Sequence, residues 1–281
     1  MPGKLYLCAT PIGNLEDITY RVVRVLGEVD IIGAEDTRNS IKLLNHFDIK
    51  TPMESYHEFN KYDKAKDLVN KMLDGKNVAL ITDAGTPGIS DPGEELVKQC
   101  HEAGIEVTSL PGATACTTAL SMSGLSTRRF CFEAFLPKDK KTKEKVLESL
   151  QEEPRTIIIY EAPHRLKTTL QDLKNHLGNR RITFCREMTK KYEQVLRTTI
   201  DEAMEYYKVN EPRGEFVLVI EGKSLEEIEQ AKRDRWDNMS IEEHMDVYLK
   251  QGFDKKESMK LVAKDRGVAK RDIYNSLVKE K

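Results

Sequence analysis

Residues 77–93 read NVALITDAGTPGISDPG, in which an apolar strand pattern runs into a loop rich in glycine and proline and then into a helix pattern. In open α/β sheets, ligands bind beyond the carboxyl ends of the strands, where small residues let the backbone approach them closely. The stretch therefore predicts a ligand-binding loop with Asp83 at the edge of the sheet. The structural alternative is a tight turn in which Asp91 caps the following helix.

The same alternation extends on both sides of this loop. Short apolar runs at residues 5–10, 29–35 and 105–110 predict further strands. The spacing of apolar residues at 64–75 and 94–103 predicts amphipathic helices that end at glycines. A strand followed by a helix, repeated at this spacing, favours a largely parallel sheet.

A second alternating block follows a break in periodicity at residues 124–143, which we interpret as a linker and the start of a solvated basic helix. A helix is expected at 164–177, with Pro163 as a natural first helical residue. Residues 192–200 can return as a hairpin strand. The other strands of this block are expected at 156–161, 181–187 and 215–222.

Beyond residue 222 the pattern is wholly helical. Ser240 with Glu243 three residues later predicts a capping box, and the helix–Gly267–helix arrangement that follows resembles a helix-turn-helix. A small three-helix cap without a ligand is the alternative. We therefore expect a two-domain α/β protein with a C-terminal helical module, divided into residues 1–124, 125–223 and 224–281.

Composition excludes several classes of protein. The 281 residues are 39% hydrophobic and 33% charged, which is typical of a globular chain. The apolar runs are strand-sized, well below the roughly 20 residues of a membrane helix, and the N-terminus has no targeting pattern, so we expect a cytoplasmic protein. The five cysteines and six histidines are dispersed without metal-ligand spacing, so no metal site is expected.

Known nucleotide fingerprints are absent from the chain. Neither GxxxxGK[ST] nor a GxGxxG after a strand occurs, which disfavours phosphate transfer and dinucleotide redox chemistry. AEDTR at residues 34–38 instead places Glu35, Asp36 and Arg38 at a strand end, where a carboxylate beside a fixed arginine can take a proton from a hydroxyl. A structural ion pair between Asp36 and Arg38 is the alternative.

Positive charge gathers in the middle and at the end of the chain. Residues 126–223 carry 20 Lys and Arg against 16 Asp and Glu, and the stretch 255–281 carries nine against four. Such groups suit a phosphate-facing surface, although a solvated charged face is the plain alternative. The candidates for phosphate contact are Arg128, Arg129, Lys138, Lys140, Lys141, Lys264, Arg266, Lys270 and Arg271, and the resemblance given next implies that the phosphates are those of RNA.

Seven segments in order resemble the S-adenosylmethionine-dependent tetrapyrrole methylase fold family, in its ribosomal RNA branch. The segments are ATPIGNLEDIT (9–19), AEDTR (34–38), TDAGTPGISDPG (82–93), PGATA (111–115), YEAPHR (160–165), REMTKKYE (186–193) and RGEFVLVIEG (213–222). The resemblance implies two α/β domains with the cofactor in a cleft and a homodimer. Carried over segment by segment, the cofactor contacts fall on Pro11, Asp83, Gly85, Thr86, Thr114, Ala115, Tyr160, Glu161, Ala162, Gly214, Glu215 and Phe216.

The resemblance also implies the acceptor, which is the ribose 2'-hydroxyl of a cytidine in the decoding region of 16S ribosomal RNA within the small subunit. Because this hydroxyl is weakly acidic, a base is needed, and Glu35, Asp36, Glu187 and Glu215 are the candidates, assisted by Arg38 or Arg186. Two alternatives stay open. A methylase of the same fold could act on a small tetrapyrrole-type molecule, and a non-catalytic RNA-binding protein could keep the fold.

Overall fold

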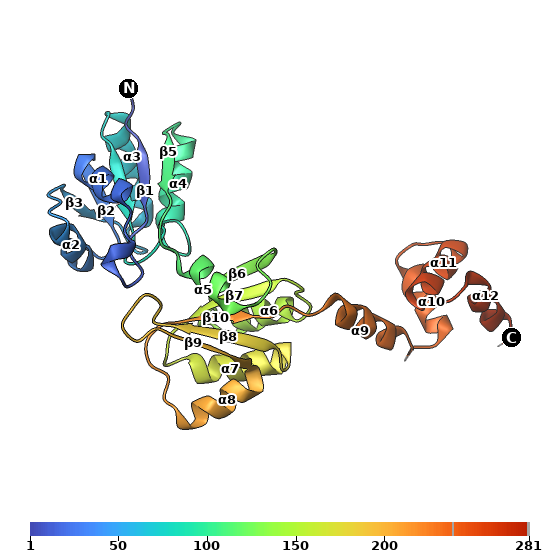
Figure 1. The fold of residues 1–281 in the computed structure, drawn as a ribbon. Coiled ribbons are helices and arrows are strands. Elements are labelled where there is room, and N and C mark those ends of the chain that lie inside the picture. Colours follow the sequence, from blue (N-terminus) through green and yellow to red (C-terminus); the bar gives the residue numbers. More distant parts are fainter. Residues whose placement is uncertain (238, 280–281) are drawn as a thin grey trace. The chain divides into compact units, whose positions relative to one another are not determined.

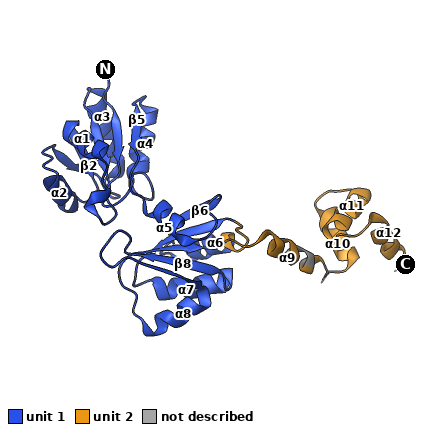
Figure 2. Cartoon of the chain, in the orientation of Figure 1, with its two compact units in different colours: residues 1–148, 155–221 blue, residues 149–154, 222–281 orange. Residues whose placement is uncertain are grey.

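A computed structural model describes residues 1–237 and 239–279 of the chain, with the side chains of 231–233, 235, 237 and 279 left aside. The described residues form two compact units, shown in Figure 2. Unit 1 contains residues 1–148 and 155–221, and unit 2 contains residues 149–154 and 222–281. Both β-sheets of the protein belong to unit 1 (Figure 1).

The first sheet is entirely parallel, as the alternation of strand and helix predicts. Its spatial order is β3-β2-β4-β1-β5. The strands are β1 (Leu5–Cys8), β2 (Ile31–Ala34), β3 (Met53–Ser55), β4 (Val78–Ile81) and β5 (Val107–Leu110). Since all five strands run the same way, their carboxyl ends meet at one edge.

Helices cover both faces of the first sheet, which explains why β4 is buried along its whole length. Helices α1 (Tyr20–Glu28) and α2 (Thr37–His46) pack through Val22, Leu26 and Leu44 on one face. Helices α3 (Lys61–Leu73) and α4 (Gly93–Glu102) pack through Leu68 and Leu96 on the other. The predicted helices at 64–75 and 94–103 are therefore confirmed.

The second sheet is mixed, in the order β6-β7-β10-β8-β9. Only β6 and β7 run parallel, and the return strand β9 confirms the predicted hairpin with β8. The strands are β6 (Phe130–Phe135), β7 (Thr156–Glu161), β8 (Arg181–Arg186), β9 (Gln194–Thr199) and β10 (Phe216–Ile220). The helices of this part are α5 (Ala115–Ser123), α6 (Lys140–Leu150), α7 (Leu166–Leu177) and α8 (Ile200–Val209).

Two expectations for this part need correction. Residues 124–143 are no simple linker, because β6 lies inside them and pairs with β7. Its hydrophobic side chains are only half-buried or exposed, so the strand shows no clean alternation. Helix α7 begins at Leu166 and not at Pro163, because Ala162 and Pro163 accept hydrogen bonds from the amides of Arg165 and Leu166 in a preceding turn.

Unit 2 contains the helices α9 (Leu225–Asp237), α10 (Ile241–Lys250), α11 (Lys255–Asp265) and α12 (Lys270–Lys279). Its small core joins Met245, Val262, Ala263 and Ile273. The capping box predicted at Ser240 is confirmed, as its side chain and that of Glu243 bond each other's backbone amides.

Across the described ranges, no helix is both long and apolar enough to cross a membrane. Four of the five cysteines, Cys8, Cys100, Cys116 and Cys185, are buried free thiols, and Cys131 is half-buried.

Candidate active site

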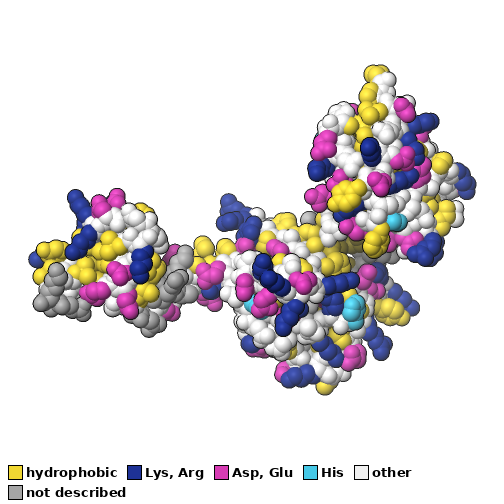
Figure 3. Space-filling model, turned by 180° about the vertical axis from the view of Figure 1, so that it is seen from behind, with side chains coloured by type: hydrophobic (Ala, Val, Ile, Leu, Met, Phe, Trp, Pro, Cys, Tyr) yellow, Lys and Arg dark blue, Asp and Glu magenta, His cyan; other side chains and the backbone are white. Residues whose placement is uncertain are grey.

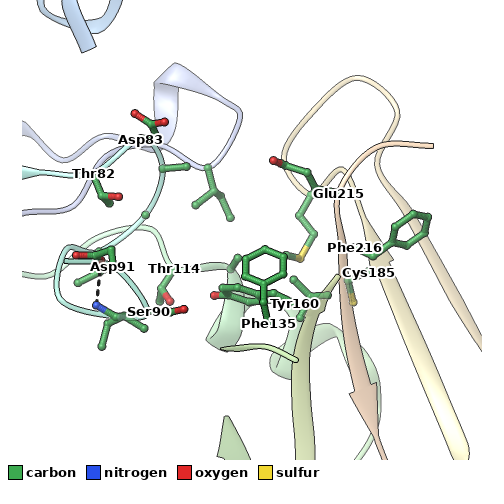
Figure 4. Close-up of a pocket in the computed structure, with 18 of the residues that line it drawn as sticks. Thr82, Asp83, Ser90, Asp91, Thr114, Phe135, Tyr160, Cys185, Glu215 and Phe216 are labelled. Atoms are coloured by element: carbon green, nitrogen blue, oxygen red, sulfur yellow. Dashed lines mark hydrogen bonds between the residues drawn. The ribbon is translucent and has the colours of Figure 1, made fainter. Parts of the chain in front are cut away.

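A cavity of about 370 Å³ opens in unit 1 where the loops after the first sheet face the ends of strands of the second (Figure 4). Loops that follow β1, β2, β4 and β5 supply one wall. The other wall comes from the ends of β6, β7 and β8 and the start of β10. Because β10 is antiparallel to β7 and β8, its first residues lie beside their last residues. The sheet topology therefore brings segments from residue 12 to residue 217 around one space.

The glycine- and proline-rich loop is organised by Asp91. Its carboxylate accepts hydrogen bonds from the amides of Gly88, Ile89 and Gly93 at 2.8–3.1 Å, so Asp91 closes the loop and binds the first amide of α4. Asp91 is not the expected helix cap, because the N-cap position is occupied by Pro92. The buried Tyr56 donates from its hydroxyl to the carbonyl of Pro92 at 2.7 Å. The loop thus forms the predicted tight turn and also lines the cavity.

Two neighbouring loops are joined through Thr10 and Gly85. Their amides and carbonyls bond each other at 2.9 and 3.0 Å, and the Thr10 hydroxyl donates to the carbonyl of Thr82. Gly85 has a φ of 88°, in the left-handed region that a side chain rarely adopts. The Thr82 hydroxyl in turn donates to Glu35 Oε2 at 2.7 Å, which holds that carboxylate at the cavity.

The aromatic side chains of Phe135 and Tyr160 line the opposite wall. The rings of Phe132 and Phe135 meet the ring of Tyr160 edge-on, at centroid distances of 4.8 and 5.7 Å. Burial raises the pKa of Tyr160 to about 12, so its hydroxyl stays protonated. Next to it, the buried Glu161 accepts hydrogen bonds from the Ala162 amide and the Thr169 hydroxyl. A flat apolar group finds a matching surface here.

A charged cluster closes the wall at the ends of β8 and β10. Lys190 donates to Glu187 and to Glu215 at 3.0 and 2.9 Å, and the Glu215 amide donates to Glu187 Oε1. The Glu215 amide, together with Lys190, holds the pKa of Glu187 below its usual range. Gly214 has a φ of 76°, and a Cβ there would lie 2.4 Å from Glu187 Cγ. Only glycine therefore fits beside Glu187.

Most candidate residues from the sequence lie at this cavity. Glu35 and Glu187 line it, and so do all the proposed cofactor residues except Pro11 and Gly214, which adjoin the lining residues Ile12 and Glu215. Asp36 and Arg38 are outside the lining. Asp36 caps α2 and binds the exposed Arg38 side chain at 2.7 Å. The two residues therefore form the structural ion pair that is the alternative to a role in proton transfer.

The proposed RNA-contacting residues divide by exposure. Arg128, Arg129, Lys138, Lys140, Lys141, Lys264 and Arg271 are exposed, and Lys270 is half-buried. Arg266 differs, because its guanidinium bonds the carbonyls of Met239 and Ser240 and the ring of His244. It therefore holds the helices of unit 2 together.

Sequence reasoning missed several lining residues, among them Ile12, Thr82, Phe135, Cys185 and Lys190. Thr82 and Lys190 lie within the segments TDAGTPG and REMTKK, so taking each segment whole would have included them. Phe135 had no signal, because it lies on the strand that the sequence pattern did not reveal.

The lining has a definite electrostatic character. It contains the carboxylates of Glu35, Asp83, Asp91, Glu161, Glu187 and Glu215, and one cation, Lys190. A ligand with positive groups and a flat apolar portion matches these walls, whereas a phosphate meets mostly like charge.

The comparisons with known proteins agree with this geometry. Residues 4–204 match the family of tetrapyrrole (corrin/porphyrin) methylases. A ribosomal RNA small subunit methyltransferase I from Halalkalibacterium halodurans is 50% identical over 273 residues, which cover 97% of this chain and 94% of that protein. The protein of that name from Bacillus subtilis is 46% identical over 274 residues, 98% of this chain and 94% of its own length.

Among solved structures, uroporphyrin-III C-methyltransferase from Thermus thermophilus, complexed with S-adenyl homocysteine, is similar with a TM-score of 0.55 at 18% identity. The similarity covers 77% of this chain and 97% of that one. At this identity it bears on the fold, and it confirms the expected two-sheet α/β architecture. With the family match over most of the chain, these findings show that the protein belongs to the tetrapyrrole methylase family and has the class III methyltransferase fold.

Proposed function

We propose that this protein uses S-adenosylmethionine to methylate the ribose 2'-hydroxyl of a cytidine in the decoding region of 16S ribosomal RNA, within the small subunit. The observation that carries the methyltransferase part is the acidic, aromatic-walled cavity built by the family's own segments. The names of relatives at 50% and 46% identity support ribosomal RNA as the substrate. The cytidine and its 2'-hydroxyl rest on the resemblance of the sequence segments to the ribosomal RNA branch.

The residues present fit the cofactor. S-adenosylmethionine carries a sulfonium, an ammonium and a flat adenine, and the walls offer carboxylates for the first two and apolar side chains such as Phe135, Tyr160 and Met188 for the third. The residues that would hold it are Pro11, Asp83, Gly85, Thr86, Thr114, Ala115, Tyr160, Glu161, Ala162, Gly214, Glu215 and Phe216. When bound, the cofactor supplies an activated methyl group.

The protein itself must hold the acceptor hydroxyl in line and accept its proton. Fixed orientation of this kind is worth up to about 7–11 kcal/mol of the barrier. We propose Glu35 as the base among the candidates. Its Oε2 is held by a neutral hydroxyl, and its Oε1 has no hydrogen-bond partner among the residues that the structure describes.

Glu187 is less suited to this role. Both a backbone amide and Lys190 stabilise its charged form and lower its pKa, which makes it a weaker base. We propose that Glu187 and Lys190 shape the wall. Asp36 and Arg38 satisfy each other outside the lining, so we propose that they fix the start of α2, beside Glu35.

We propose that the exposed Lys and Arg side chains at positions 126–145 and in unit 2 contact the RNA backbone. Arg266 would stabilise unit 2 through its hydrogen bonds to backbone carbonyls. Residues 1–124, 125–223 and 224–281 are then the cofactor-loop part, the part that completes the cavity and the RNA-binding part. The proposal also includes a homodimer and action in the cytoplasm, where small subunits assemble. Light scattering of the purified protein tests the dimer.

Transfer of tritiated methyl from S-adenosylmethionine to small ribosomal subunits of an unmethylated strain tests the function. We expect label in the RNA fraction with the wild-type protein, together with binding of S-adenosyl homocysteine in calorimetry. Cofactor binding without label in any ribosomal RNA would leave a small-molecule methylase as the alternative. If the protein binds no cofactor, the methyltransferase proposal fails.

A further inference from the structure

A second cavity, of about 430 Å³, lies at the same end of the second sheet but involves its other face. Side chains alternate between faces along a strand, and β8 shows the consequence. Cys185 and, just beyond the strand, Glu187 line the candidate active site, whereas Arg186 between them lines the second cavity. Phe216 contributes to both linings, and Figure 4 shows its ring turned away from Tyr160 and Phe135. The two cavities are therefore neighbours across the edge of one sheet.

The second cavity has the opposite charge to the first. Two arginines, Arg186 and Arg213, line it with a single carboxylate, Glu211, which is already paired with Lys167 at 2.6 Å. Arg186 binds the Gln194 side chain through one nitrogen, while its buried Nε has no partner among the described residues. The exposed Arg213 makes no ion pair or hydrogen bond through its guanidinium within the described part of the chain. Donors for an anion are thus present and uncommitted.

Aromatic surface adjoins these arginines. Tyr206 is 39% exposed, and its ring meets that of the buried Tyr207 edge-on at 5.0 Å, so a rigid aromatic face borders the cavity. Single-stranded RNA is bound by this combination, with bases stacked on aromatic rings and phosphates on arginine.

At two other places among the described residues, charged side chains do not offer RNA an equivalent site. On the face shown in Figure 3, Lys and Arg side chains are interspersed with Asp and Glu. The charged side chains that line the candidate active site are mainly carboxylates, which repel phosphate. An RNA strand that places a ribose at that site must therefore set its phosphates elsewhere.

We propose that the cavity at Arg186, Arg213 and Tyr206 binds a nucleotide that flanks the acceptor in the RNA strand, with its phosphate on the arginines and its base against Tyr206. This inference rests on the proposed function and adds the place where the neighbouring nucleotide is held. It predicts that the site acts on the affinity for RNA and leaves cofactor binding untouched.

The variants Arg213→Gln, Arg213→Glu and Tyr206→Leu test the proposal, with Lys66→Glu as the matched control. Lys66 is exposed on α3, outside the cavities described. The readouts are the KM and kcat for unmethylated small subunits, the salt dependence of subunit binding, and the Kd for S-adenosyl homocysteine. Arg213 and Tyr206 are surface residues, so their replacement is compatible with folding, which circular dichroism checks.

We expect Arg213→Gln to raise KM roughly tenfold, as for one lost charged hydrogen bond. The slope of log Kd against log salt should fall by about 0.7, the value of one phosphate contact to single-stranded RNA. Arg213→Glu should raise KM further, Tyr206→Leu should raise it without changing the slope, and Lys66→Glu should change neither.

Unchanged KM and salt slope in Arg213→Glu, with an active wild-type protein, would overturn the subsite. So would a change in oligomeric state in that variant, which would make this surface an interface between copies. Failure of the proposed function gives a different result, because the wild-type protein itself would then label no RNA.

Discussion

Glu35 and Glu187 face the same cavity but are held by different groups. Glu35 accepts from the neutral hydroxyl of Thr82, and Glu187 accepts from Lys190 and a backbone amide. A carboxylate already stabilised by a cation gains less by taking a proton. The difference in hydrogen-bond partners is the reason why we propose Glu35 as the base and Glu187 as a residue that shapes the wall.

Replacing Glu35 by Gln removes the proposed base and keeps the size of the side chain. We expect kcat to fall by about 10²- to 10⁴-fold, the usual contribution of a general base, with the Kd for S-adenosyl homocysteine unchanged. Single-turnover methyl transfer and calorimetry measure the two. Glu102→Gln, at an exposed position of α4, is the control, and a Glu35→Gln protein with wild-type kcat would rule out this base.

Gly214→Ala tests the wall at Glu187. The added Cβ would lie 2.4 Å from Glu187 Cγ at a φ of 76°, so both the backbone and the carboxylate must move. We expect binding of S-adenosyl homocysteine to weaken about tenfold or more, because a displacement of the wall changes the cavity. Gly27→Ala on α1, where a Cβ meets nothing within 4 Å, should leave binding as it is. Equal affinities for the two variants would contradict the account.

His244 gives unit 2 a dependence on pH. Its ring is fully buried and stacks on the ring of Trp236 at 3.8 Å, its Nδ1 accepts from Arg266, and its Nε2 faces Asp265 at 3.3 Å. Burial is the main cause that lowers its pKa below 6.5, and the charge of Arg266 acts in the same direction. The folded unit therefore holds a neutral ring and binds fewer protons than the unfolded chain.

The neutral His244 should then contribute its full share to the free energy of unfolding of unit 2 above pH 6.5. This contribution should be lost as the pH falls through the pKa of folded His244. Trp236 is the chain's single tryptophan, so its fluorescence during urea unfolding reports on this unit. We expect the midpoint to drop between pH 7 and pH 5. A midpoint that stays constant or rises over this range would contradict the neutral assignment of His244.

At the scale of elements, capping boxes start helices in both units. Thr199 with Glu202 begins α8 in unit 1, and Ser240 with Glu243 begins α10 in unit 2. Each box satisfies amides at the start of the helix that would otherwise lack partners.

Ser240→Ala should lower the free energy of unfolding of unit 2 by about 1 kcal/mol, the usual value of an N-cap side chain. Ser240→Asp, which keeps a capping oxygen, should lose much less. Urea unfolding followed by Trp236 fluorescence measures both. An alanine variant as stable as the wild type would show that the box contributes nothing.

The sequence predicts elements well where burial imposes a period. Strand β4 and the helices α3 and α4 follow their apolar patterns, and the cap at Ser240 follows from hydrogen bonding between near neighbours. Strand β6 is not predicted from the sequence, because its side chains are half-buried or exposed on both faces and show no alternation of apolar and polar residues. Local patterns also cannot show that Pro163 stands in a turn ahead of its helix, since proline suits both positions.

Much of the candidate site is predictable because glycines and prolines mark its loops. Asp83 and Gly85 stand out in the sequence, and their segment resembles the family's. Which carboxylates face the cavity is not predictable, since Asp36 turns to Arg38 while Glu35 beside it turns to Thr82. The cavity of Arg186 and Arg213 is not predictable without the sheet, because it depends on Arg186 of β8 lying on the face opposite Cys185 and on the loop before β10 bringing Arg213 beside it.

At the scale of the whole molecule, unit 1 holds every residue that lines the candidate active site. Parallel strands in the first sheet and an antiparallel partner in the second bring distant loops to one place (Figure 1). Unit 2 adds a helical module with exposed basic side chains at Lys264 and Arg271. We therefore expect cofactor chemistry to belong to unit 1 and part of the RNA affinity to unit 2.

Nucleoside mass spectrometry of the RNA product tests the central claim most directly. Small subunits from an unmethylated strain are treated with the full-length protein and S-adenosylmethionine, and the 16S ribosomal RNA is then digested and its modified nucleosides are mapped. The account predicts one new 2'-O-methylcytidine in the decoding region, absent from a Glu35→Gln reaction. A methyl group on a base, on another nucleotide or on no RNA at all would contradict it.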